Sequence, residues 1–136
     1  MRIHGSCAAR DGRGVLVIGP PASGKSDLVL RLLDRGFDLV ADDQVDVEDG
    51  WVRPPDALAG LLEVRGLGLL RLPHLAEARL ALAISAGVPD RLPEPRTHLG
   101  APLIVLDPLE ASAPAKVERA LACAAGAPML AGAFAP

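Results

Sequence analysis

The sequence predicts an α/β protein built on a mixed sheet with flanking helices. The first observation is a short β-branched apolar run at 14–18 that leads into a glycine-rich loop. The second is an amphipathic helical pattern at 25–35, directly behind that loop. The third is the recurrence of short apolar runs farther along the chain, interrupted by one hairpin. Buried strands that alternate with amphipathic helices are typical of this fold class.

Over residues 1–41, the sequence predicts strands before and after a single helix. Residues 2–9 are a candidate strand, and Gly14–Ile18 has the composition of a buried one. In the helix predicted over 25–35, leucines recur at helical spacing opposite a charged face. Gly36 is suited to the C-terminal cap of this helix. A second buried strand is predicted over 37–41.

The middle of the chain predicts a hairpin followed by less regular structure. An Asp-Gly pair at 49–50 separates Gln44–Glu48 from Trp51–Arg53, as expected of two strands joined by a tight turn. Two prolines then end the hairpin. We expect a short helix at 57–62 and a strand-like segment over 63–70.

Two more strands and one helix are predicted in the last part of the chain. The apolar runs 79–85 and 103–106 have the length of strands. The stretch 88–102 contains four prolines, which predicts a loop between them. Ser112 is a suitable first residue for the final helix, because serine is favoured at helix N-caps.

The domain organisation follows from length and from the end of the chain. A chain of 136 residues has the size of one domain. Residues 126–136 are rich in alanine, glycine and proline, and we expect this tail to be disordered. Residues 1–125 are therefore expected to form the single domain.

Composition argues against several kinds of partner. The net charge is −3 and no run of basic residues occurs, so we expect no nucleic-acid partner. With one tryptophan, two phenylalanines and no tyrosine, a base-stacking platform is also not expected. No apolar run reaches the roughly 18 residues of a membrane span, and the N-terminus lacks an apolar signal region. The two cysteines have no metal-ligand spacing, which favours reduced thiols and a cytoplasmic location.

A complete G-x-x-x-x-G-K-S pattern, the Walker A phosphate loop (P-loop), lies between the first buried strand and the helix. Glycines let successive N–H groups point at one anion, and the helix start adds its dipole. Lys25 can reach the β- and γ-phosphates, and the Ser26 hydroxyl can bind Mg²⁺. The sequence therefore predicts ATP and Mg²⁺ as ligands. The expected nucleotide-binding residues are Gly19, Pro20, Pro21, Ala22, Ser23, Gly24, Lys25 and Ser26.

Two adjacent carboxylates, Asp42 and Asp43, end the strand that follows the helix. Ligands of open α/β sheets sit at the carboxyl ends of strands. Neighbouring side chains of a strand point to opposite sides. One carboxylate can therefore hold the metal while the other takes a proton from an attacking hydroxyl. A charged strand end leading into a turn is the alternative, but the phosphate loop favours the functional interpretation.

Three segments resemble the HPr kinase/phosphorylase family. The run Arg35–Asp43 is similar to that family's Arg-Gly-His-x-Leu-Val-x-Asp-Asp, and Glu63–Gly68 nearly matches its Glu-Ile-Arg-Gly-Leu-Gly signature. His4-Gly5 fits a His-Gly upstream of the phosphate loop. The resemblance extends from His4 to about Leu121. It implies the fold of the HPr kinase C-terminal domain and an ATP-dependent serine kinase of an HPr-like phosphocarrier, regulating a phosphotransferase system.

The resemblance also implies catalytic roles. Asp43 is the first choice for the base that takes the serine proton, and Asp42 is the second. His4 would lie beside these carboxylates. Lys25 would contact the transferring phosphate, and Arg91 would steady it.

Metal ligands follow from the same resemblance. Ser26, Glu63 and Asp43 would complete the Mg²⁺ shell. Arg65 can bind phosphate or pair with a structural carboxylate. The family assembles as a hexamer, so a homo-oligomer is expected.

Departures from the family pattern leave other functions open. Phe37 replaces the family's histidine, and the family's C-terminal Pro-Val-x-Pro-Gly-Arg-Asn run is replaced by residues 106–116. That run is linked to phosphorolytic removal of the phosphate, so the kinase direction is the safer expectation. The chain resembles the short, α-proteobacterial form, without the long N-terminal domain. One alternative is a small-molecule kinase with 88–102 as its lid. Another is a nucleotide-sensing module without catalysis.

Overall fold

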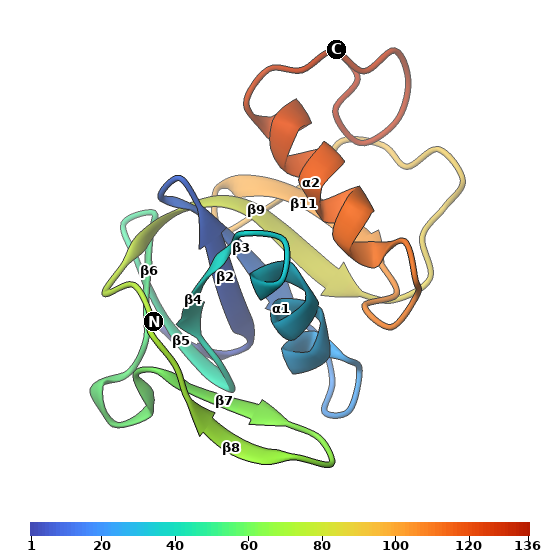
Figure 1. The fold of residues 1–136 in the computed structure, drawn as a ribbon. Helices are drawn as coiled ribbons and strands as arrows, with labels where there is room; N and C mark the ends of the chain where they lie inside the picture. The colour runs from blue at the N-terminus through green and yellow to red at the C-terminus, as the bar shows by residue number, and fades with distance from the viewer.

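The computed structural model describes residues 1–136 as a large mixed sheet with both helices on one face and a small hairpin beside it (Figure 1). The main sheet has the order β1-β5-β6-β9-β3-β2-β4, with β11 on β9 and β10 on β11. Its strands are β1 (Arg2–His4), β2 (Ser6–Arg10), β3 (Arg13–Ile18), β4 (Asp38–Ala41), β5 (Gln44–Glu48), β6 (Trp51–Arg53), β9 (Ala78–Ala86), β10 (Thr97–His98) and β11 (Ala101–Leu106). The remaining elements are α1 (Lys25–Leu33), α2 (Ala113–Ala124), the 3₁₀ turn η1 (Asp56–Leu58) and the hairpin strands β7 (Leu61–Val64) and β8 (Gly68–Arg71).

β9 is the strand that makes the sheet mixed. Along one edge it runs parallel to β3. Along its other edge it pairs first with β6, antiparallel at Ala78 and Arg79, and then with β11, parallel from Ala83 to Ala86. The remaining strand pairs are antiparallel. The predicted mixed α/β class is thus confirmed, and so is the hairpin over 44–53.

The sheet has a corner where the chain bends between β1 and β2 and, beside it, between β4 and β5. The single strand expected over 2–9 is wrong: Gly5 divides it, because β1 pairs with β5 while β2 pairs with β4. Across the bend, the Gly5 N–H donates to the Asp43 carbonyl at 3.1 Å. Asp43 itself has a positive φ of 69°, so the chain turns sharply there. The turn places Asp42, which is buried, and Asp43, which is exposed, at this corner.

The core lies in two layers, one on each face of the sheet. Side chains alternate along β3, so Val15 and Val17 face the helices while Leu16 faces the opposite side. The helix-side layer buries Leu28, Val29 and Leu32 of α1 and Val117, Ala120 and Leu121 of α2. The opposite layer includes Val45 and Val47 of β5 and Val52 of β6. Because β3 and α1 both pack into the helix-side layer, the two ends of the loop between them are held in place.

The expected helix at 57–62 is wrong. Only the short 3₁₀ turn over 56–58 forms there, and β7 begins at Leu61. The side chain of Leu62 is fully buried, whereas Glu63 is exposed, so the segment alternates as a strand does. The stretch expected as one strand over 63–70 is the rest of a hairpin, with Glu63 paired to Leu69.

Smaller differences occur at the ends of the other elements. α1 ends at Leu33, two residues before the expected boundary, and Gly36 follows with a φ of 87°. The proline-rich 88–102 stretch includes the short strand β10, and β11 begins at Ala101. Residues 126–136 have neither helix nor strand, and Phe134 packs partly buried against the helix-side core. Neither helix has the length and apolar character needed to cross a membrane.

Candidate active site

The loop between β3 and α1 ends in a helix start whose backbone donors are free. Gly24 is the N-cap, with a φ of 97° and no side-chain cap. No group of the chain accepts a hydrogen bond from the N–H groups of Lys25 or Ser26; the first bond of the helix runs from Leu28 N–H to the Gly24 carbonyl. Unpaired N–H groups and the helix dipole together favour an anion at this position.

Lys25 is held by its own loop. Its Nζ donates to the carbonyls of Gly19 at 2.9 Å and Pro20 at 2.8 Å. An ammonium group has three donors, so a third N–H remains for a ligand. The positive charge thus lies beside the free helix start, where it adds to the attraction for an anion.

Asp42 is the buried centre of the site. Its side chain is only 5% exposed, and its Oδ1 accepts from Ser26 Oγ at 2.6 Å and from Ser6 Oγ at 2.8 Å. Its Oδ2 accepts from the backbone N–H of Glu63 at 3.2 Å. All three donors are neutral, and no lysine or arginine pairs with this carboxylate. A buried carboxylate without a cationic partner is costly, so a cation that arrives beside it is favoured.

Ser6 is the residue of this group that sequence reasoning missed. It is fully buried in β2 and lies next to the bend. A single serine in an apolar strand belongs to no motif. Only the pairing of β2 with β4 brings it to Asp42, which follows 36 residues later. Its role therefore depends on tertiary structure and leaves no local signal.

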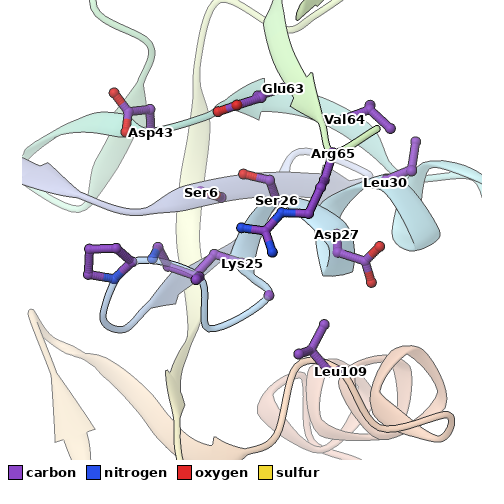
Figure 2. A pocket seen from close by; sticks show the side chains of 13 residues that line it. Ser6, Lys25, Ser26, Asp27, Leu30, Asp43, Glu63, Val64, Arg65 and Leu109 are labelled. Carbon is purple, nitrogen blue, oxygen red and sulfur yellow. The ribbon is translucent and has the colours of Figure 1, made fainter. Parts of the chain in front are cut away.

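A cavity of about 370 Å³ opens in front of these groups. Figure 2 shows the carboxylates of Asp43 and Glu63 at one end and Leu109 at the opposite end, with Lys25 and Arg65 between them. The hairpin of β7 and β8 contributes one wall, and the helix start contributes another. The lining residues are Ser6, Pro21, Ala22, Gly24, Lys25, Ser26, Asp27, Leu30, Asp43, Glu63, Val64, Arg65 and Leu109.

Not every predicted site residue reaches this cavity. Asp43 and Glu63 line it, whereas Asp42 lies behind Ser26. His4 is exposed in β1 opposite Gln44 and is absent from the lining. Arg91 is exposed in the loop after β9 and is likewise outside it.

The donor set suits a magnesium ion carried in with phosphates. The chain has no group of three or more His, Cys, Asp or Glu side chains that could hold a metal alone. Magnesium in phosphoryl-transfer sites is bound by one or two carboxylates, with substrate phosphates and water completing the shell. The Ser26 hydroxyl and the carboxylates of Asp43 and Glu63, all of which line the cavity, fit that requirement.

The fold and the site are those of a mixed α/β protein in which a helix start that attracts anions faces carboxylates across a cavity. Residues 1–78 match the HPr Serine kinase C-terminal domain family. The chain belongs to this family.

Curated relatives and a solved structure agree with the assignment. The HPr kinase/phosphorylase of Clostridium novyi (strain NT) is 44% identical over 78 residues, which are 54% of this chain and 25% of that protein. That of Streptococcus mutans serotype c is 42% identical over 78 residues, with the same coverage. The chain thus spans about a quarter of the length of these relatives. The Hpr(Ser) kinase/phosphatase of Coxiella burnetii has a similar structure, with a TM-score of 0.72 and 28% identity, over 88% of this chain and 92% of that one.

Proposed function

We propose that this chain is an ATP-dependent kinase that phosphorylates a serine of an HPr-like phosphocarrier protein. One observation carries the proposal: a single cavity gathers the free helix start, Lys25 and Ser26 on one wall and the carboxylates of Asp43 and Glu63 on another. Membership of the HPr serine kinase C-terminal domain family supports an HPr-like protein as the substrate.

The nucleotide phosphates bind at the loop 19–24 and the start of α1, where backbone N–H groups and Lys25 neutralise their charge. Mg²⁺, when bound through Ser26, Asp42 or Asp43, and Glu63, neutralises the charge that develops on the phosphate oxygens. Lys25 exchanges its bonds to the loop carbonyls for bonds to phosphate. Charge neutralisation and positioning supply most of the catalysis in phosphoryl transfer.

The two aspartates have different tasks in this proposal. Asp42 is buried and occupied by three donors, so it fixes Ser26 and the hairpin. Asp43 is exposed and lines the cavity, and none of those donors reaches it. Asp43 accepts the proton of the carrier serine as the serine oxygen bonds to the γ-phosphorus. The bond from that phosphorus to the bridging oxygen of ADP breaks, and ADP leaves.

The test is transfer of label from γ-labelled ATP to an HPr-like carrier in the presence of Mg²⁺. The wild-type protein should label a carrier serine, and Lys25→Ala should abolish the label. Lys116→Ala is the matched control, because Lys116 is the only other lysine and its ammonium bonds Glu110 instead. Asp43→Asn should lose transfer and keep ATP affinity. Label that survives in Lys25→Ala would refute the site assignment.

The two alternatives give different results in the same experiment. A small-molecule kinase would leave the carrier unlabelled and turn over ATP with a small hydroxyl or acid acceptor. A nucleotide-sensing module would bind ATP and transfer nothing to any acceptor.

A further inference from the structure

A second cavity, of about 340 Å³, lies between α2, β11 and the C-terminal tail over residues 126–136. It shares no residue with the cavity of the candidate active site. The lining residues that α2 contributes recur at helical spacing and form one stripe along the helix. Figure 1 shows the tail turning back beside the C-terminal end of α2. We call this space the tail cavity.

The tail is held at this cavity by its own contacts. The Phe134 N–H donates to Met129 Sδ at 3.3 Å, which closes the tail into a loop. The Ala127 N–H donates to the carbonyl of Ala122 at 3.0 Å, which joins the start of the tail to the end of α2. The side chain of Phe134 packs against the helix-side core, as does Ile104 of β11. The walls of the cavity are therefore part of the folded structure, as expected of a small-molecule site.

The side chains inside the tail cavity offer almost no hydrogen-bonding groups. Apart from two cations, they are three alanines and Ile104, Cys123, Met129 and Phe134. The hydroxyl or amide groups of a ligand would lose their water here without gaining a partner, which is unfavourable. A hydrocarbon body, in contrast, is favoured because its burial releases no such groups from water.

Arg119 is the cation of this cavity that has no partner within the chain. It is exposed and takes part in none of the ion pairs, and the neighbouring Glu118 pairs with two other arginines. The second cation, Lys116, bonds Glu110 at 2.6 Å, so its charge is already compensated. One uncompensated positive charge beside an apolar cavity matches a ligand with one negative charge, and a guanidinium is well suited to a carboxylate.

We propose that the tail cavity is a binding site for a small aliphatic monocarboxylate. Its hydrocarbon chain lies against Ile104, Met129 and Phe134, and its carboxylate pairs with Arg119. A volume of about 340 Å³ is near the lower limit of small-molecule sites, so the ligand has a chain of about eight carbons and is not a long fatty acid. This inference does not depend on the proposed function, because the two cavities share no residue.

The two methionines of the chain provide the test, because Met129 lines the cavity and Met1 does not. Methionine labelled with ¹³C in its methyl group gives one NMR signal for each. Titration with octanoate should shift the Met129 signal until it saturates and leave the Met1 signal in place. Acetate, which lacks the hydrocarbon body, and octylamine, which has the opposite charge, should give no saturable shift. Octanoate should also slow the alkylation of Cys123 by iodoacetamide, because Cys123 lines the same cavity.

A variant of the arginine tests the charge. Arg119→Gln keeps a polar side chain at this exposed position and removes its charge. It should weaken octanoate about threefold to fivefold, the effect of an exposed ion pair, and leave the affinity for 1-octanol unchanged. Arg71→Gln is the matched control, because Arg71 is exposed in β8 and lines neither cavity. It should bind octanoate as the wild-type protein does.

Three results would overturn the proposal. A Met129 signal that does not shift, or that moves together with Met1 without saturating, would show that the cavity holds no such ligand. Equal octanoate affinity in the wild-type protein and Arg119→Gln would refute the carboxylate as the recognised group. A Met129 shift that follows protein concentration without octanoate would show that a second copy of the chain fills the cavity instead.

Discussion

Replacing Ser6 by alanine removes one of the three donors that hold the Asp42 carboxylate. Both residues are buried, so water cannot replace the lost bond. A hydrogen bond to a charged group contributes about 1.5–3 kcal/mol, and its loss inside a protein leaves the acceptor partly unsatisfied. Because Ser26 and the Glu63 N–H still donate to Asp42, we expect a loss near the middle of that range, about 2 kcal/mol in the free energy of unfolding.

Urea denaturation followed by circular dichroism measures this loss. With an m-value of about 2 kcal/mol/M, the midpoint should fall by about 1 M while the m-value stays the same. Ser112→Ala is the matched control, because Ser112 is exposed and makes no side-chain cap bond; it should cost less than about 0.5 kcal/mol. A Ser6→Ala variant as stable as the Ser112→Ala variant would show that the buried Asp42 carboxylate does not depend on the Ser6 hydroxyl.

Two further predictions concern titrating groups. Hydrogen bonds from Arg35 and Arg10 lower the pKa of the Glu118 carboxyl, so this group stabilises the fold above its unfolded pKa and ceases to do so as the pH falls through its folded pKa. Glu118→Gln should therefore lower the melting temperature at neutral pH and change it little in strong acid; an equal loss at both would contradict this. Burial raises the pKa of the Cys7 thiol, so iodoacetamide at mildly alkaline pH should alkylate the half-buried Cys123 first. Equal rates in the native protein would count against the buried position of Cys7.

Features with a contiguous signal could be predicted from the sequence. The buried strand, the glycine-rich loop and the helix over residues 14–33 follow one another directly, so spacing alone predicts their arrangement. The hairpin over 44–53 has a two-residue turn that specifies it. Asp43, Glu63 and Ser26 line one cavity, and their roles as base and metal ligands stay predictions.

Features that depend on distant contacts could not be predicted. Ser6 meets Asp42 only because β2 and β4 pair, and Leu109 meets Gly24 only because α1 and the loop after β11 are packed together. The prediction of a helix over 57–62 was wrong for a different reason. Its short apolar run fits a helix as well as a strand, and pairing with β8 decides between them.

The proposed function requires that this cavity move a phosphoryl group from ATP to a serine of a carrier protein. Mass spectrometry of an HPr-like carrier, after incubation with the wild-type chain and Mg²⁺–ATP, measures that transfer without a label. We predict one added phosphate that maps to a single carrier serine and is absent with Lys25→Ala. An unmodified carrier, in the presence of a protein that binds ATP, would contradict the proposed function.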